Sequence, residues 1–355
     1  MRYKLLGSSG LRVSELCLGA LTFGTEAGIG SEKAESFSVF EAFANAGGNF
    51  IDTANKYNNG TSERYLGDFV STDRDRFVLA TKYALTMRPD DPNAGGNHRK
   101  NMRQSVEESL KRLKTDYIDL YWLHQWDFTT GEEEVMRGLD DLIRAGKVHY
   151  IGISDTPAWL ISRSHTIAEL RGWSRFVALQ VEYSLIERTA ERDLIPMAKH
   201  LDFGVTVWGA VAAGILTGKY KPGATPNDGL RTERNAPRLN ERNLEIAATV
   251  ESVAKARGTS AAQVALNWVR QQNQQMFPII GNRTVAQIED NIASLDNPLT
   301  DEELDTLNAA SAIELGFPHE FLTRESMISM RLGDSADRLD NHRALTHMDP
   351  GHERD

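Results

Sequence analysis

The sequence has one cysteine, Cys17, among its 355 residues. An internal disulfide is therefore excluded, and such scarcity is typical of proteins from reducing compartments. Because Cys17 lies in an apolar run, we expect it to be a small core residue. Positive charge is also scarce, since 40 lysines and arginines face 50 acidic residues and the net charge is -10. Nucleic-acid-binding proteins usually show the opposite balance, so we expect no nucleic-acid partner.

Long apolar runs are missing as well. The longest uncharged stretch, residues 203–218, is shorter than the roughly 20 residues of a membrane-spanning helix. Residues 1–7 have no apolar core of the kind found in signal peptides. With 40% hydrophobic and 25% charged residues, the composition is that of a globular protein with a large core. We therefore expect a cytoplasmic protein without a membrane partner, and a homo-oligomer is compatible with this composition.

What the sequence does contain is a repeated alternation of apolar, β-prone segments and amphipathic segments. After a hairpin over residues 3–13, eight strands are predicted at residues 16–20, 50–52, 77–82, 118–124, 148–154, 177–181, 203–208 and 277–281. Helices are predicted at residues 32–46 (capped by Ser31), 62–70, 99–113, 131–145, after Pro157, and at 190–200, 241–272 (one or two helices) and 284–294. Eight such units predict an α/β protein with a (β/α)8 TIM barrel. A doubly wound sheet is the alternative, but residues 18–24 lack the G-x-G-x-x-G spacing.

Three segments are longer than ordinary barrel loops. Residues 84–98 and 213–239 leave the carboxyl ends of predicted strands, so we expect them to lie over the barrel mouth, where they can close it. Residues 316–355 follow the last barrel helix. We predict a single barrel over residues 1–315 and a C-terminal extension over 316–355 that is partly a lid or flexible. Three histidines of this extension are spaced by five residues, which fits no metal site, and we expect no bound metal.

Chemically active side chains end three consecutive strands of the predicted barrel. Asp52, Lys82 and His124 follow apolar runs, and Tyr57 lies in a polar turn five residues after Asp52. Since carboxyl ends of barrel strands meet at one mouth, we expect these four side chains to converge. A lysine ammonium lowers the pKa of a nearby phenol, a carboxylate holds the ammonium in place, and an imidazole hydrogen-bonds a substrate oxygen. This set suits the protonation of a carbonyl oxygen as a hydride arrives. Taken singly, an aspartate or lysine at a strand end is as often a structural ion pair as a catalytic group, and a histidine after an apolar run is more often a core residue.

A hydride requires a nicotinamide site at the same mouth. Ser154, Asp155 and Gln180 carry donors and acceptors suited to a carboxamide, and Tyr183 is placed to stack on the nicotinamide ring. Residues 281–291 follow the last strand and open a helix, the usual place of a phosphate site in barrels. There Arg283 can pair with a 2′-phosphate, and Gln287 and Asn291 share one helix face that can reach adenine.

At this point the sequence resembles the aldo-keto reductase family over about residues 1–312. The family motif Asp-Thr-Ala-x-x-Tyr stands at residues 52–57, and further motifs match at 62–67, 81–82, 119–124, 152–154, 216–220 and 281–291. The resemblance implies a barrel that binds NADPH without a Rossmann domain, with Tyr57 as acid/base, Lys82 and Asp52 tuning it, and His124 orienting the carbonyl. The sequence is more similar to the bacterial and potassium-channel β-subunit-like branches than to the aldose reductase branch.

The resemblance also implies a wider cofactor site. Its further contacts are Gly19, Thr22, Phe23, Asp52, Trp208, Gly209, Ala210, Val211, Gly214, Leu216, Lys219, Arg231 and Gly281. The chain departs from the family at Asp155, where asparagine is usual, at Ala210, where proline is usual, and at Asn58-Asn59. A carboxylate at position 155 accepts hydrogen bonds but donates none.

The expected function is NADPH-dependent reduction of an aldehyde or ketone to an alcohol. We expect the substrate to contact Tyr57, Tyr83, His124 and Trp126, an aromatic set that favours a hydrophobic or flat carbonyl compound. One alternative is an NADP(H)-binding regulatory or sensor subunit with slow turnover. Another is a Schiff-base lyase with Lys82 as nucleophile, which an acidic neighbour at Asp52 disfavours.

Overall fold

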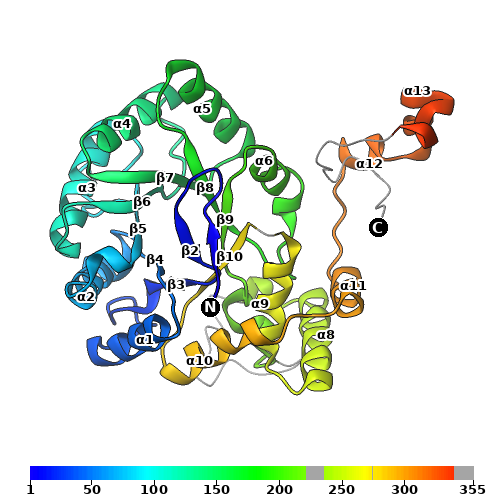
Figure 1. Ribbon diagram of the computed structural model, residues 1–355, viewed down its shortest axis with the longest axis horizontal. Coiled ribbons are helices and arrows are strands. Elements are labelled where there is room, and N and C mark those ends of the chain that lie inside the picture. Colours follow the sequence, from blue (N-terminus) through cyan, green and yellow to red (C-terminus); the bar gives the residue numbers. More distant parts are fainter. Residues whose placement is uncertain (221–235, 274, 340–355) are drawn as a thin grey trace.

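The computed structural model describes residues 1–220, 236–273 and 275–339. Its centre is a closed barrel of eight parallel strands in the order β10-β3-β4-β5-β6-β7-β8-β9 (Figure 1). The strands are β3 (Cys17–Gly19), β4 (Phe50–Asp52), β5 (Val78–Tyr83), β6 (Ile118–Leu123), β7 (Val148–Ser154), β8 (Phe176–Glu182), β9 (Gly204–Trp208) and β10 (Met276–Ile280). The predicted (β/α)8 barrel is confirmed.

Helices surround the barrel in Figure 1. They are α1 (Lys33–Asn45), α2 (Thr61–Phe69), α3 (Arg99–Leu113), α4 (Glu132–Arg144), α5 (Ala158–Arg171), α6 (Leu194–His200), α8 (Glu241–Arg257), α9 (Ala261–Gln272), α10 (Val285–Ala293) and α11 (Asp301–Ala310). One capping prediction was wrong, because α1 follows Glu32 without a side-chain cap. The hydroxyl of Ser31 instead donates to the carbonyl of Arg283, 2.9 Å away, and so ties α1 to the loop after β10.

The N-terminal hairpin of β1 (Tyr3–Leu5) and β2 (Arg12–Ser14) closes the end of the barrel at which the strands begin. Leu6 and Val13 are fully buried and pack with the interior side chains of the strands. Gly7 has φ +55° and lies close to both β8 and the start of β9. A Cβ at this position would be 2.3 Å from a backbone oxygen of β8, so only glycine fits here. The opposite end, where the strands finish, is the mouth.

Strand residues alternate between the interior of the barrel and the helical layer. Phe50, Val78, Ala80, Leu120 and Trp122 pack together inside the barrel. Their sequence neighbours Ile51, Leu79, Tyr121 and Leu123 pack against the helices instead. This two-residue period decides which strand-end side chains can reach the mouth.

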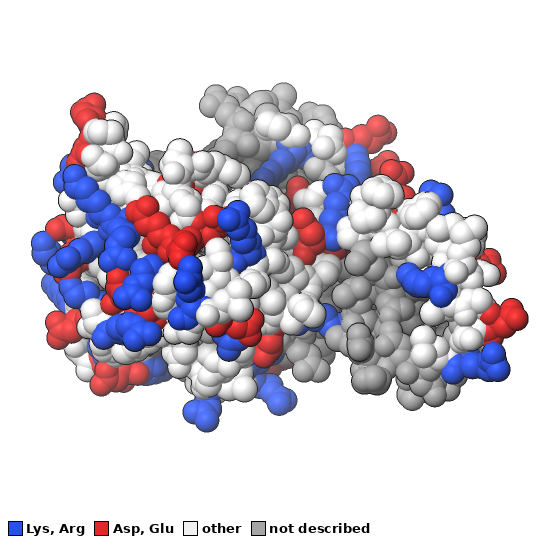
Figure 2. Space-filling view, turned by 90° about the horizontal axis from the view of Figure 1, so that it is seen from above, with Lys and Arg blue, Asp and Glu red and all other residues white. Residues whose placement is uncertain are grey.

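After α11 the chain forms two short helices, α12 (His319–Leu322) and α13 (Glu325–Leu332), which project to one side of the barrel (Figure 1). The lid role of this extension stays a prediction. Basic and acidic side chains are interspersed over the face in Figure 2. Among the described helices, none has the length and apolar character needed to cross a membrane.

Candidate active site

Three neighbouring strands bring the central side chains to the mouth. In the parallel register, Asp52 of β4 lies beside Ala80 of β5, and Lys82 of β5 lies beside Trp122 of β6. Asp52 and Lys82 have the same alternation phase as the interior residues Phe50 and Ala80, so both point inward. His124 follows β6 with the same phase as Trp122. The expected convergence of these strand ends is therefore present.

The central contacts form one hydrogen-bonded group. Lys82 is fully buried, and its Nζ donates to a carboxylate oxygen of Asp52, to the carbonyl of Thr53 at 2.9 Å and to the hydroxyl of Tyr57 at 3.0 Å. The second Asp52 oxygen accepts from Nε2 of Gln180 at 3.1 Å. The Tyr57 ring meets the His124 ring edge to face, with centroids 5.9 Å apart. The phenol thus has an ammonium on one side and an imidazole on the other.

The charge of Lys82 is held by its neighbours. Burial alone works to lower the pKa of Lys82, but the Asp52 carboxylate and the Tyr57 hydroxyl outweigh it and raise that pKa above its ordinary value. The lysine therefore remains an ammonium at neutral pH. A protonated amine is not a nucleophile, so this environment disfavours the Schiff-base alternative.

The pKa of Tyr57 is shifted in the opposite direction from the one predicted. Lys82 does act to lower the pKa of Tyr57, as the sequence predicts, but burial of the phenol has the larger effect and raises the pKa above its ordinary value. The phenol is therefore fully protonated at neutral pH. A protonated Tyr57 fits the role of proton donor.

His124 is a neutral imidazole in this site. Burial, assisted by the positive charge of Lys82, lowers its pKa from 6.5 to about 3. Its Nδ1 is buried and has no hydrogen-bond partner within the described residues. At physiological pH, the neutral ring can therefore donate one hydrogen bond to a substrate oxygen without adding charge.

We expect the His124 resonance to show no titration between pH 8 and pH 5. Its folded pKa of about 3 lies below the value of about 6.5 in an unfolded chain. Stability from the neutral ring is thus complete above pH 6.5 and is lost as pH falls toward 3. The measurement is a histidine-selective NMR titration, with the resonance assigned by its absence in His124→Gln. Titration of that resonance near pH 6.5 would contradict the neutral assignment.

A left-handed turn fixes the position of Tyr57. Asn58 and Asn59 have φ of 47° and 51°, followed by Gly60 at φ 86°. The Asn58 amide donates to the carbonyls of Leu21 and Phe23, both at 2.9 Å, and accepts from the backbone N–H of Ala27. Asparagine tolerates this conformation better than most residues, so the departure at positions 58–59 is a positioning device. Sequence reasoning missed this role, although paired asparagines before glycine are a turn signature.

The far side of the mouth carries the residues expected to hold a carboxamide. Ser154 and Gln180 are buried at the ends of β7 and β8, in register with each other. Asp155 has φ 40°, a region that asparagine and aspartate both tolerate, and its carboxylate accepts from the indole Nε1 of Trp208 at 3.4 Å. Gly209, at φ +75°, turns the chain away after β9. Ala210 is buried beside it, and Val211 is half-buried.

The segment after β10 fits a dinucleotide phosphate. Nothing in the described chain lies within 4 Å of the place where a Cβ at Gly281 would stand. The buried Asn282 Nδ2 lacks a partner among described residues, while its Oδ1 accepts from Asn291 at 2.7 Å. Arg283 is exposed just before α10, and its backbone N–H donates to the Gln287 side chain at 2.9 Å. Open backbone, an unpaired amide and an exposed arginine together suit an anionic ligand at a helix start. Asn282 was not among the predicted residues.

The neighbouring strands β3 and β10 pack closely together. A Cβ at Gly19 would lie 2.6 Å from the Ile279 side chain, so only glycine fits there. Thr22 is buried, and its hydroxyl donates to the carbonyl of Asn282 at 2.8 Å. Gly19 and Thr22 therefore shape the wall next to the proposed phosphate segment.

Two tyrosines predicted to contact the cofactor or the substrate lie away from the mouth. Tyr183 is buried against Trp268, with ring centroids 5.1 Å apart, and its hydroxyl donates to Glu191, so it cannot stack on a ligand at the mouth. Tyr83 stacks on Tyr121 in the helical layer, away from a substrate. Both have the outward phase of their strands.

Other predicted positions are also occupied by core packing. Phe23 packs edge to face on Phe69, and the Leu216 side chain is fully buried in the core, so neither side chain contacts a ligand. Trp126 is buried in the loop after β6, where its backbone N–H donates to the Asp155 carbonyl. Gly214 lies in a left-handed turn at φ 96°, and Lys219 is exposed. Arg231 lies outside the described residues.

A barrel whose mouth carries a buried lysine–aspartate pair, a protonated phenol and a neutral imidazole has the architecture of an acid–base enzyme. The chain belongs to the aldo/keto reductase family, because the model of that family matches residues 15–312. The expected family is thereby confirmed, and the chain is an aldo-keto reductase.

Three fungal relatives illustrate the similarity. The chain is 40% identical to norsolorinic acid reductase stcV of Emericella nidulans, over 88% of this chain and 82% of that protein. It is 35% identical to aryl-alcohol dehydrogenase [NADP(+)] of Phanerodontia chrysosporium, over 98% and 92% of the two chains. It is 35% identical to aldo-keto reductase ausK of Aspergillus calidoustus, over 90% and 85%. These relatives do not support the expected bacterial and potassium-channel β-subunit-like branch.

Proposed function

We propose that this protein reduces aromatic aldehydes or ketones to alcohols with NADPH, reversibly, and that Tyr57 is the proton donor. The observation that carries the proposal is the Tyr57 hydroxyl, held 3.0 Å from the Lys82 ammonium and flanked by the neutral ring of His124. A carbonyl oxygen placed between Tyr57 and His124 meets two neutral hydrogen-bonding groups. These groups stabilise the negative charge that develops on that oxygen.

The protein residues have separate tasks in this reaction. A bound nicotinamide supplies the hydride. Tyr57 gives its proton to the carbonyl oxygen, and Lys82 stabilises the phenolate that remains. Asp52 balances the charge of Lys82 and is itself held by Gln180. His124 orients the oxygen.

Residues from several strand ends would hold the cofactor. Ser154 and Gln180 lie where they can bind the carboxamide. Trp208, rather than Tyr183, has the inward phase and the half-exposed ring needed to stack on the nicotinamide. Gly281 to Arg283 and the start of α10 suit the phosphates, and Gln287 and Asn291 lie along the same helix.

The preference for an aromatic carbonyl rests on two supports. The relatives include an aryl-alcohol dehydrogenase and a norsolorinic acid reductase by name. The mouth itself presents the rings of Tyr57, His124 and Trp208, and aromatic side chains favour flat ligands. The test is NADPH oxidation with matched pairs of substrates, benzaldehyde against cyclohexanecarbaldehyde and acetophenone against its cyclohexyl analogue. Higher kcat/KM for the aliphatic member of both pairs would overturn the preference.

We expect Arg283→Ala to reduce the preference for NADPH over NADH by about 10- to 100-fold, because a charge-assisted pair with a phosphate contributes about 1.5–3 kcal/mol. The measured quantity is the ratio of kcat/KM for the two cofactors. Arg175→Ala, an exposed arginine at the start of β8, is the matched control and should leave the ratio unchanged. An unaltered ratio in Arg283→Ala would refute the assignment of the 2′-phosphate contact. Tight NADPH binding without turnover of any carbonyl would instead favour the regulatory subunit.

A further inference from the structure

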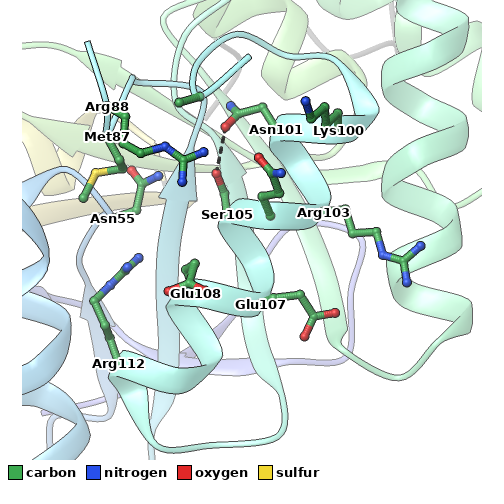
Figure 3. Close-up of a pocket in the computed structure, with 12 residues that line it drawn as sticks. Asn55, Met87, Arg88, Lys100, Asn101, Arg103, Ser105, Glu107, Glu108 and Arg112 are labelled. Carbon is green, nitrogen blue, oxygen red and sulfur yellow. Dashed lines mark hydrogen bonds between the residues drawn. The ribbon is translucent and has the colours of Figure 1, made fainter. Parts of the chain in front are cut away.

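A cavity of about 560 Å³ lies between α3 and the loop that follows β5, apart from the residues of the active site (Figure 3). Its volume falls in the range of small-molecule sites. The lining consists of Asn55, Met87, Arg88, Ala94, Lys100, Asn101, Arg103, Gln104, Ser105, Glu107, Glu108 and Arg112. The cavity thus combines buried polar groups, two apolar side chains and several charges.

The buried wall of the cavity contains an amide without partners. Asn55 is fully buried, and neither its Oδ1 nor its Nδ2 has a hydrogen-bond partner within the described residues. Figure 3 shows this amide beside the side chains of Met87 and Arg88, at the wall opposite α3. A buried amide with both groups unsatisfied costs free energy, since such groups are nearly always paired. A ligand that both donates and accepts a hydrogen bond would remove that cost.

The charges of the cavity leave an excess of cation. Arg88, Arg112, Glu107 and Glu108 are each paired, with Asp91, Glu63, Lys147 and Lys111 respectively. Lys100 and Arg103 are exposed and form no salt bridge in the part of the chain that the structure describes, although the charge of Lys100 acts on the Asp91 carboxylate. Figure 3 shows Arg103 pointing away from Asn55, which leaves Lys100 as the cation beside the cavity. Lys100 lies in the first turn of α3, where the helix dipole also favours an anion, so an anion beside it would be stabilised by the ammonium and by the dipole.

We propose that this cavity binds a small organic anion with a carboxylate at one end and a hydroxyl at the other. The carboxylate lies at Lys100, and the hydroxyl donates to Oδ1 and accepts from Nδ2 of Asn55. The apolar middle of the ligand contacts Met87 and Ala94. Because Asn55 is fully buried, this binding mode requires the side chains of Met87 and Arg88 to move aside.

The occupant would adjoin the catalytic segment. The backbone N–H of Asn55 donates to the carbonyl of Lys82 at 3.2 Å. Thr53, which accepts from the Lys82 ammonium, and Tyr57 each lie two residues from Asn55 in the chain. This cavity is therefore a second ligand site that shares a loop with the proton donor.

The test uses the full-length protein with 13C-labelled methionine methyl groups, among which Met87 is assigned by its absence in Met87→Leu. The probe is 4-hydroxybenzoate. We expect saturable shifts of the Met87 resonance, with at least tenfold weaker binding of benzoate, which lacks the hydroxyl, and of 4-hydroxybenzyl alcohol, which lacks the carboxylate. No shift at Met87, or shifts only at other methionines, would overturn the proposal.

Two variants check the assigned contacts. Lys100→Ser should weaken 4-hydroxybenzoate at least tenfold, whereas Lys255→Ser, which removes the same charge elsewhere, should leave its affinity unchanged. Asn55→Ala should bring the affinities of 4-hydroxybenzoate and benzoate to within about threefold of each other. Equal weakening by both charge variants, or an undiminished preference for the hydroxylated probe in Asn55→Ala, would refute the binding mode. Circular dichroism confirms that each variant is folded.

Discussion

Replacement of Tyr57 by phenylalanine is expected to lower kcat/KM for carbonyl reduction by about 100- to 10,000-fold, the usual contribution of a positioned general acid. The structure gives the reason. The hydroxyl is the group that Lys82 contacts at 3.0 Å, and burial keeps it protonated at neutral pH. Without it, the developing alkoxide has no proton donor, while the ring still fills its place beside His124.

The control is cofactor affinity, measured by quenching of tryptophan fluorescence with NADPH. Tyr57→Phe should bind NADPH as the parent does, because the proposed cofactor contacts come from other strand ends. Tyr65→Phe, at a half-buried tyrosine on α2, is the matched substitution and should keep full turnover. If Tyr57→Phe retained the parental rate, the proton-donor assignment would fall, and the proposed function would need another acid.

The fold was predictable because alternation of apolar and amphipathic segments recurs eight times. The predicted helix at residues 99–113 coincides with α3, Arg99–Leu113. Helix α11 (Asp301–Ala310) escaped prediction although its signature was available. The start of α11 is a capping box in which Thr300 and Glu303 each bond the other's backbone, a pattern readable as Thr-x-x-Glu.

The convergence of Asp52, Lys82 and His124 was predictable because each lies at the end of a strand and all three share one alternation phase. The two tyrosines wrongly predicted to face the mouth, Tyr83 and Tyr183, have the opposite alternation phase. Lys82 and Tyr83 are adjacent in β5, so only one of them can face the mouth. The same holds for Glu182, the last residue of β8, and Tyr183, which follows it. Counting in twos from Lys82 along β5 and from Gln180 along β8 would have excluded both tyrosines. Asn282 could not be found this way, because its unpaired amide depends on how the loop after β10 folds.

Removal of one partner of the buried Lys82–Asp52 pair is expected to destabilise the fold by about 3–5 kcal/mol, since the other charge is left buried without compensation. The side chain of Lys82 is 0% exposed and that of Asp52 is 4% exposed. Lys82→Met leaves a carboxylate, and Asp52→Asn leaves an ammonium. The double variant leaves neither, so we expect it to recover most of the lost stability in urea unfolding.

Activity should follow a different order from stability. The double variant lacks the ammonium that stabilises the phenolate of Tyr57, so its turnover should stay as low as that of Lys82→Met even though its fold is restored. The pKa of Lys82 is higher in the folded state than in the unfolded chain, where it is about 10.4. The ammonium's contribution to stability is therefore complete below about pH 10.4 and is lost only as pH rises through the higher pKa of the folded state. The stability difference between parent and Lys82→Met should therefore be constant from pH 7 to 9. Recovery of both stability and turnover in the double variant would show that the pair is structural alone, and a double variant less stable than either single one would show that the charges are not coupled as the geometry indicates.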